Sequence, residues 1–539
     1  MLSPHNSSLK APQIYDTTLR DGAQTQGVNL SMDDKLSVIH ILCELGIDYI
    51  EAGWPGSNPK DQEFFKRLLS IDSGKTQFVA FGATRRPQLR VTEDPQLKSL
   101  LAAQTPVVTL VAKTWDYHVT EVLNTDLKNN LAMIKDSVAF CKDSGKQVIL
   151  DCEHFFDGYQ NNAHYAHDCL AAALEAGADN ISLCDTNGGQ MPEAISEVVH
   201  TMRLLFPSIS LGIHCHNDCE LAVANSLAAW RSGVELIQGT MNGVGERCGN
   251  ANLTSLLPTL QLKYQVQCLE EEKLSQLTLA AQTLSNIFNL PLSAYTPYVG
   301  RSAFAHKGGI HVSAVEKAPD TYEHVNPNLV GNHREILISE LSGRSNVRVQ
   351  MQKLETQHPL NDETISEVLN AVKRLEMEGL DLEESDGTFE LLVHKATEQY
   401  EPAFQLLEVN SHFHHHLGHS LCQGMVKLRI HGQQVHTIAE AEGPIEAIDK
   451  AFRLALSPHF KAIEIIKLID YKVRIIDPVK AAAATTRVWI QATDGEKTWS
   501  TVGCSQNIIT ASSHALNDCF ELFLARISTK RIQDDDKAA

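Results

Sequence analysis

Two histidines stand two positions apart in the stretch LGIHCHNDCELA, residues 211–222. Alternate side chains of a β-strand share one face, so His214 and His216 are predicted to point the same way and Cys215 the opposite way. Two imidazoles placed like this could bind one metal ion together. The alternative is a pair of histidines that only forms hydrogen bonds in a polar environment, and the motif alone leaves that choice open. Cys215 is interpreted as a packing residue.

A second motif, DTTLRDGAQ, occupies residues 16–24. Asp21 could supply the carboxylate of a two-histidine, one-carboxylate metal site, which leaves coordination positions open for a substrate. The neighbouring Arg20 could donate hydrogen bonds to a substrate oxygen that gains negative charge. The alternative is an ordinary ion pair between these two residues at a strand end.

The first half of the chain predicts a scaffold that would bring these motifs together. Short apolar runs that end in polar residues alternate with helix-like segments, at residues 13–21, 49–55, 78–83, 107–114, 148–155, 180–186, 211–218 and 236–245. This pattern is typical of a (β/α)8 TIM barrel, whose active site lies where the C-terminal strand ends meet. The residues predicted to lie at this mouth are Arg20, Asp21, Glu153, Asp185, Thr186, His214, His216 and Asn242.

The rest of the chain predicts two further parts, giving an α/β protein of three domains. Residues 10–270 are expected to form the barrel, residues 271–410 a helical subdomain, and residues 421–530 an α+β domain with antiparallel strands. The histidine-rich stretch SHFHHHLGHS, residues 411–420, is interpreted as a solvated linker.

A glycine-rich stretch, NGVGERCGNANL, follows the eighth run at residues 242–253. Its spacing is GxGxxxG, which does not match the dinucleotide-binding fingerprint. A tight turn that presents Asn250 to the barrel mouth is the interpretation.

Composition narrows the class of protein. The 539 residues carry 46 Lys and Arg against 66 Asp and Glu, a formal net charge of −20, which argues against nucleic-acid or anionic-membrane partners. The 12 cysteines include no CxxC pair and lie mostly in apolar runs, which indicates reduced thiols in the cytoplasm. No apolar run has the length of a membrane-spanning helix, so a soluble protein is expected.

Three motifs together carry a resemblance to a known family. DTTLRDGAQ, HCHNDCELAVANS (214–226) and GVGERCGNANL (243–253) resemble the Claisen-condensing acyltransferases with a DRE-type barrel, the group of the isopropylmalate, homocitrate and citramalate synthases. The barrel motifs are shared with hydroxymethylglutaryl-CoA lyase, but the C-terminal half resembles the dimeric regulatory domain of the isopropylmalate and citramalate synthases. The stretches EAGWPGSNPKD (51–61) and LDCEHFFDGY (150–159) are most similar to the citramalate synthase branch.

This resemblance implies a reaction and its cofactor. The enzyme would condense acetyl-CoA with pyruvate and hydrolyse the product to citramalate and CoA, in isoleucine biosynthesis. A divalent metal ion, Mn²⁺, Mg²⁺ or Zn²⁺, would be held by Asp21, His214, His216 and Asn250. A 2-isopropylmalate synthase, or another 2-oxoacid acetyltransferase, is the alternative activity, and a lyase like the hydroxymethylglutaryl-CoA enzyme is a further one.

The resemblance also assigns roles to the remaining residues. Arg20 would hold the keto oxygen and Thr186 the carboxylate of the 2-oxoacid. Glu153 would be catalytic, and His311 and Tyr322 would be contributed from beyond the barrel, with His311 as the candidate base. A homodimer with isoleucine as feedback inhibitor is implied by the C-terminal domain.

Overall fold

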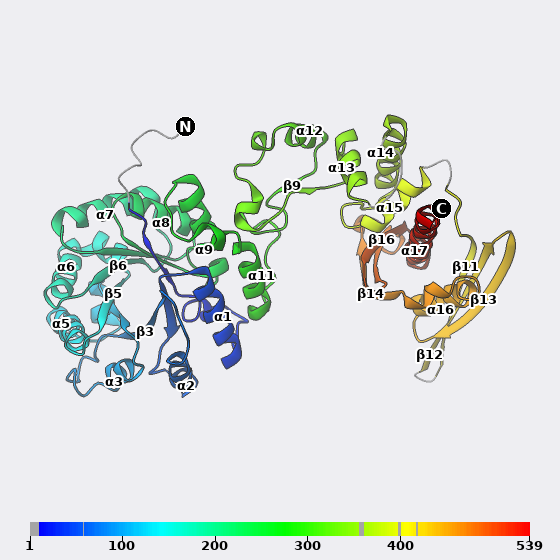
Figure 1. The fold of residues 1–539 in the computed structure, drawn as a ribbon. Helices are drawn as coiled ribbons and strands as arrows, with labels where there is room; N and C mark the ends of the chain where they lie inside the picture. Colours follow the sequence, from blue (N-terminus) through cyan, green and yellow to red (C-terminus); the bar gives the residue numbers. More distant parts are fainter. Residues whose placement is uncertain (1–9, 58, 355–360, 397–399, 417–418, 539) are drawn as a thin grey trace. The chain divides into compact units, whose positions relative to one another are not determined.

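The computed structural model describes residues 10–57, 59–354, 361–396, 400–416 and 419–538. The chain divides into two compact units. The first comprises residues 1–304 and 325–333, and the second comprises residues 305–324 and 334–539 (Figure 1). The residues predicted as a helical subdomain are therefore shared between the two units.

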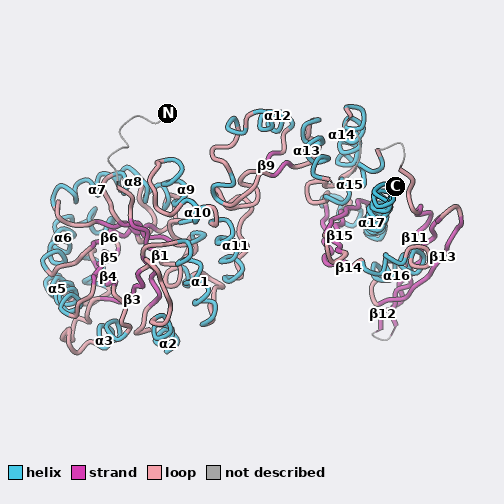
Figure 2. Tube along the Cα trace, in the orientation of Figure 1, coloured by secondary structure: helices cyan, strands magenta, loops and turns pink. Residues whose placement is uncertain are grey.

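The first unit is a closed barrel of eight parallel strands, which confirms the predicted (β/α)8 fold. Figure 2 shows its strands in magenta with helices around them. Each strand pairs with the next one in sequence, and β8 pairs with β1 to close the barrel. The strands are β1 (Gln13–Asp16), β2 (Tyr49–Gly53), β3 (Gln77–Ala83), β4 (Val107–Lys113), β5 (Gln147–Glu153), β6 (Asn180–Asp185), β7 (Leu211–Cys215) and β8 (Leu236–Gly239).

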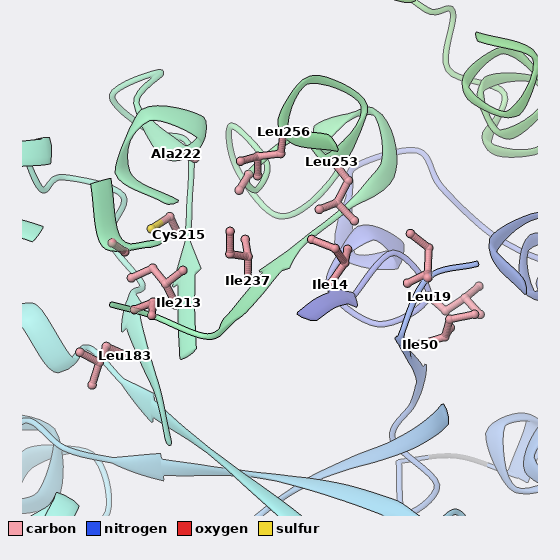
Figure 3. Packing of buried hydrophobic residues seen from close by; sticks show 14 of the residues in the cluster. Ile14, Leu19, Ile50, Leu183, Ile213, Cys215, Ala222, Ile237, Leu253 and Leu256 are labelled. Atoms are coloured by element: carbon pink, nitrogen blue, oxygen red, sulfur yellow. The ribbon is translucent and has the colours of Figure 1, made fainter. Parts of the chain in front are cut away.

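Helices surround these strands and bury apolar side chains against them. They are α1 (Met32–Leu45), α2 (Pro59–Leu68), α3 (Pro95–Ala102), α4 (Asp116–Glu121), α5 (Leu127–Asp143), α6 (Phe155–Glu175), α7 (Pro192–Leu205), α8 (Ala222–Arg231), α9 (Leu253–Pro258), α10 (Glu271–Leu274) and α11 (Leu277–Phe288). Figure 3 shows part of the core between strands and helices, to which Cys215 belongs together with Ala222 of α8. The predicted packing role of Cys215 is thus confirmed.

The interior of the barrel changes from apolar to polar along the strands. Near the strand starts, one buried layer consists of Tyr15, Tyr49, Val79, Val107, Ile149 and Leu236. Side chains two positions further along a strand point into the same interior. At these positions stand Glu51, Phe81, Thr109, Asp151 and Gln238, all buried. The apolar layer closes the lower end of the barrel, and the polar layer supports the mouth.

The second unit contains helices and two three-stranded antiparallel sheets. Its helices and short strands are β9 (Ala305–His306), α12 (Gly309–Lys317), β10 (Glu335–Ile336), α13 (Arg344–Lys353), α14 (Asp362–Met377), α15 (Asp386–Lys395), α16 (Pro444–Leu456) and α17 (Ile508–Ala538). The sheets consist of β11 (Phe404–His416), β12 (His419–Ile430) and β13 (Gln433–Ala441), and of β14 (Lys467–Ile475), β15 (Thr486–Thr493) and β16 (Thr498–Ser505).

The prediction of a linker at residues 411–420 is wrong for the residues in this range that the structure describes. Residues up to His416 belong to β11, which pairs antiparallel with β12, so that His412 lies opposite Gln423 and His414 opposite Leu421. β11 is an edge strand, and its histidines at 412, 414 and 415 are exposed. The polar residues at the end of β11 do not alternate with apolar ones, and this alternation is the signal from which a strand is predicted in a sequence.

The helices in the described part of the chain include none that is long and apolar enough to cross a membrane.

Candidate active site

Asp21, His214 and His216 meet at the C-terminal end of the barrel, as the sequence predicted. One potential ligand atom from each side chain lies within 4.8 Å of the others, and all three residues are buried. Across the residues that the structure describes, no other cluster of three or more His, Cys, Asp or Glu side chains has this geometry. The C-terminal end of β7 supplies the histidines, and the loop after β1 supplies the carboxylate.

His214 has a hydrogen-bond partner at each ring nitrogen. Its Nε2 lies 3.2 Å from Asp21 Oδ2, and its Nδ1 lies 2.8 Å from Gln238 Oε1. Burial acts to lower the pKa of His214, but the hydrogen bond to Asp21 and its negative charge raise it above the ordinary value. Burial likewise acts to raise the pKa of Asp21, yet Arg20 and His214 outweigh it, so the pKa lies well below its usual range.

His216 and Asn250 face each other at the rim. They form an isolated antiparallel bridge, and the buried atoms His216 Nδ1 and Asn250 Oδ1 have no hydrogen-bond partner. Buried polar atoms are rarely left unsatisfied, and an imidazole nitrogen and an amide oxygen are both metal ligands. Burial, together with the charge of His214, lowers the pKa of His216 to about 4, so the ring is neutral at pH 7. The residues present therefore fit a divalent metal ion.

Arg20 is held on three sides. Its guanidinium carbon lies 4.0 Å from the centre of the Phe81 ring, its Nη1 lies 3.3 Å from Asp21 Oδ2, and its Nε donates to Glu51. Glu51 is fully buried and accepts a second hydrogen bond of 2.7 Å from the Tyr15 hydroxyl. Glu51 was not predicted as a site residue. The signal was present as a carboxylate in the middle of the strand YIEAG, where every other residue is apolar.

A cavity of about 500 Å³ is lined by Arg20, Asp21, His214 and His216, together with two further predicted site residues. Glu153 lines the cavity and forms an ion pair with Lys113 of the preceding strand. Thr186 lines it as well, and its hydroxyl oxygen accepts a 2.8 Å hydrogen bond from the backbone N–H of His154. Trp54, Lys113 and Asp151 also line the cavity, although none of them was predicted as a site residue.

Two residues predicted at the mouth form hydrogen bonds to a neighbouring loop and to a neighbouring helix. The carboxylate of Asp185 accepts hydrogen bonds from the backbone N–H groups of Gly189, at 3.2 Å, and Gln190, at 3.3 Å. The Asn242 side chain donates to the carbonyl oxygen of Ala281 in α11, at 2.8 Å. Strand-end position alone does not distinguish a residue that faces the cavity from one that fixes a loop.

His311 and Tyr322 belong to the second unit, where their rings contact each other with centroids 4.3 Å apart. Tyr322 is 47% exposed, and the next residue, Glu323, is anchored by ion pairs to Arg334 and His306. The two predicted catalytic rings are thus adjacent to each other. Their approach to the barrel site stays a prediction.

Comparison with known proteins agrees with this geometry. The HMGL-like family model matches residues 11–283. A curated (R)-citramalate synthase from Aquifex aeolicus is 45% identical over 94% of this chain and 96% of its own length, and one from Synechocystis is 44% identical over 94% and 95%. The chain belongs to the (R)-citramalate synthase family. Membership in this family makes it an enzyme.

Two further family models match the rest of the chain. This chain matches the homocitrate synthase post-HMGL domain-like model at residues 298–379 and the LeuA allosteric (dimerisation) domain at residues 383–524. Among solved structures, a hydroxymethylglutaryl-CoA lyase from Pseudomonas aeruginosa covers 53% of this chain and 95% of its own, with 18% identity and a TM-score of 0.45.

Proposed function

We propose that this enzyme condenses acetyl-CoA with pyruvate and hydrolyses the product to (R)-citramalate and CoA, in isoleucine biosynthesis. The observation that carries the proposal is the buried Asp21–His214–His216 group, which shares one cavity with Arg20, Glu153 and Thr186. The names of the relatives that match nearly the whole chain support the same substrates.

The metal site is proposed to consist of Asp21, His214, His216 and Asn250. A divalent ion bound there would act as a Lewis acid that polarises the keto group of the 2-oxoacid. Nitrogen and oxygen ligands together suit Mn²⁺ or Zn²⁺, and Mg²⁺ is compatible when the substrate adds oxygen ligands.

Arg20 is proposed to bind the keto oxygen and to stabilise the negative charge that develops on it. The Phe81 ring and the Glu51 carboxylate hold the guanidinium in place before substrate arrives, so little reorganisation is needed during the reaction. The Thr186 hydroxyl accepts from a backbone N–H and keeps its own hydrogen for the carboxylate of the 2-oxoacid.

Carbon–carbon bond formation needs a base. We propose that His311 removes a methyl proton of acetyl-CoA, assisted by Glu153, and that Tyr322 positions the His311 ring. The methyl carbon then bonds to the keto carbon, the keto oxygen takes up a proton, and water cleaves the thioester to release CoA. Hydrolysis makes the overall reaction favourable and distinguishes a synthase from a lyase.

The activity is tested by CoA thiol release from acetyl-CoA with pyruvate, 2-oxobutanoate and 2-oxoisovalerate in parallel. Pyruvate is expected to give the highest kcat/KM, with the bulkier acids about 10–200-fold lower for each added methylene that the pocket rejects. A preference for 2-oxoisovalerate would instead assign the chain to the isopropylmalate synthases.

Metal dependence is tested separately by chelation and add-back. Activity is expected to disappear with EDTA and to return with Mn²⁺, Mg²⁺ or Zn²⁺. Turnover that is indifferent to chelation would contradict the metal site.

The second unit is proposed to form a homodimer and to bind isoleucine as a feedback inhibitor. The match to the LeuA allosteric (dimerisation) domain supports this role. A cytoplasmic location is proposed as well, supported by the absence of any disulfide among the twelve cysteines, which are all free.

A further inference from the structure

A buried chain of hydrogen bonds extends across the barrel interior from the metal-site histidine His214. His214 Nδ1 lies 2.8 Å from Gln238 Oε1, and Gln238 Nε2 donates to Asp151 Oδ1 at 2.7 Å and to Ser182 Oγ at 3.1 Å. Gln238 and Ser182 are completely buried, and Asp151 is only 3% exposed. These four residues come from β7, β8, β5 and β6, so side chains of four strands converge on one point of the interior.

The direction of each hydrogen bond in this chain is fixed by its neighbours. The hydroxyl hydrogen of Ser182 is donated to Asn180 Oδ1 at 3.1 Å, so the Ser182 oxygen can only accept from Gln238. The Asp151 carboxylate is likewise an acceptor. Both partners therefore require the NH₂ end of the Gln238 amide, and the carbonyl end must face His214.

This orientation determines the tautomer of His214. A carbonyl oxygen at Nδ1 requires that Nδ1 carry hydrogen, which leaves the lone pair of Nε2 for a metal ion on the side of Asp21. The reversed amide would place its oxygen against the Asp151 carboxylate and its NH₂ group against His214. Hydrogen would then move to Nε2 and block it as a ligand.

The backbone of β7 accommodates this chain. A Cβ atom on Gly212 would overlap Ser182 Oγ and lie 2.8 Å from Asn180 Oδ1. Glycine at this strand position leaves the room that the two side chains need.

We propose that Gln238 is a positioning residue that sets the His214 tautomer and ring orientation for metal binding, and that Asp151 and Ser182 orient Gln238 for this task. The inference rests on the proposed metal site. It adds residues that are not among the proposed metal ligands and that affect the metal ion through His214.

The test measures Mn²⁺ affinity of the full-length, metal-free protein by isothermal titration calorimetry, without substrate. Gln238→Met keeps a similar side-chain volume but removes the three side-chain hydrogen bonds to His214, Asp151 and Ser182, and is expected to weaken Mn²⁺ binding about 10–100-fold. Gln147→Met is the matched control, because Gln147 lies at the opposite end of β5 and its side-chain amide donates to the Tyr49 hydroxyl, at 3.2 Å, away from His214. Its Mn²⁺ affinity is expected to equal that of the wild type.

A rescue variant separates tautomer control from a general packing effect. The double substitution Gln238→Glu with Asp151→Asn exchanges the carboxylate and the amide. The carboxylate at position 238 again accepts from His214 Nδ1, and the amide NH₂ group at position 151 donates to the carboxylate at position 238. This variant is expected to recover most of the affinity that Gln238→Met loses. It also keeps the proposal testable if Gln238→Met does not fold, as judged by circular dichroism.

The outcomes distinguish this inference from the proposed function. A wild-type protein that binds no Mn²⁺ would contradict the metal site itself. Wild-type affinity in Gln238→Met, or an equal loss in Gln238→Met and in the double variant, would overturn the role of Gln238 while leaving the metal site in place.

Discussion

At the scale of single residues, the barrel mouth depends on charges that are buried in compensating pairs. Arg20 is neutralised by Glu51 and Asp21, and Glu51 is additionally bound by the Tyr15 hydroxyl. An unpaired buried charge is costly, so neither Arg20 nor Glu51 would be stable here alone. The same pairing that permits burial also fixes the guanidinium beside the histidines.

Replacing Arg20 tests its proposed role in stabilising the developing negative charge. Arg20→Ala is expected to lower kcat/KM by about 10²–10³-fold, the usual cost of removing one donor to a developing oxyanion. Glu51 also loses its partner, which costs about 3–5 kcal/mol of stability, so the variant must be checked by thermal unfolding. Arg90→Ala, a change at an exposed arginine, is the control and should retain full activity. Near-wild-type turnover by Arg20→Ala would contradict the mechanism.

Asp16 gives the stability of the metal-free protein a defined dependence on pH. Burial raises the pKa of this fully buried carboxyl to about 7, although hydrogen bonds from Thr18 oppose the shift. Because the folded pKa lies above the unfolded one, the contribution is fully present below about pH 4 and is lost as the pH rises to about 7. Over that interval the free energy of unfolding falls by up to about 1.4 kcal/mol per pH unit.

Asp16→Asn removes this titration. Urea unfolding of the wild type and the variant at pH 5, 6 and 7 is expected to show a shallower pH dependence for the variant, whatever its absolute stability. If the free energy of unfolding depended on pH equally in the two proteins, Asp16 would have to be ionised in the folded state over this pH range.

At the scale of elements, the loop after β8 determines where Asn250 lies. The loop returns to the barrel through the bridges Thr240–Asn252 and His216–Asn250. Gly249 has φ +88°, and a Cβ there would overlap the carbonyl oxygen of Gly243. This turn therefore requires glycine for its conformation and for the space.

A matched pair of glycine substitutions tests this loop. Gly177 has φ +89°, but a Cβ there would meet only the Lys142 side chain, at 3.8 Å. Gly177→Ala therefore measures only the cost in stability of placing a non-glycine residue in the left-handed conformation, about 1–2 kcal/mol. Gly249→Ala is expected to cost more and to weaken Mn²⁺ binding at least 10-fold, because Asn250 is displaced. Equal effects of the two substitutions on metal affinity would remove Asn250 from the proposed ligands.

At the scale of the whole molecule, the second unit has its own hydrophobic cores. One core joins residues of α13–α15, such as Val347 and Val372, to Trp489 of β15 and Val502 of β16. Backbone N–H groups of β16 also donate to α15, from Val502 to Thr388 at 3.0 Å. The helices from about residue 334 and the C-terminal sheets therefore fold together, and we propose them as one domain.

Isolated residues 334–539 are expected to fold, to dimerise and to bind isoleucine. Sedimentation equilibrium gives the oligomeric state, and calorimetry with isoleucine, using valine as control, gives the binding. A folded monomer that binds neither amino acid would contradict the regulatory role proposed for this unit.

The sequence by itself determined the barrel, the sharing of one face by His214 and His216, and the placement of Arg20 and Asp21 at the same end of the barrel. These features depend on local periodicity and on strand ends that a barrel must bring together. The end of the edge strand β11 was not predicted, because its polar residues show no such periodicity.

Only the tertiary structure decided which polar residues support the site. Gln238, Asp151 and Ser182 stand on three different strands, and their hydrogen bonds form only where the barrel closes. The same closure buries Glu51 against Arg20, whereas Asp185 accepts hydrogen bonds from the loop that follows it and Asn242 donates to α11. Contacts between residues far apart in the sequence leave no local pattern, so packing determines them and the sequence alone does not display them.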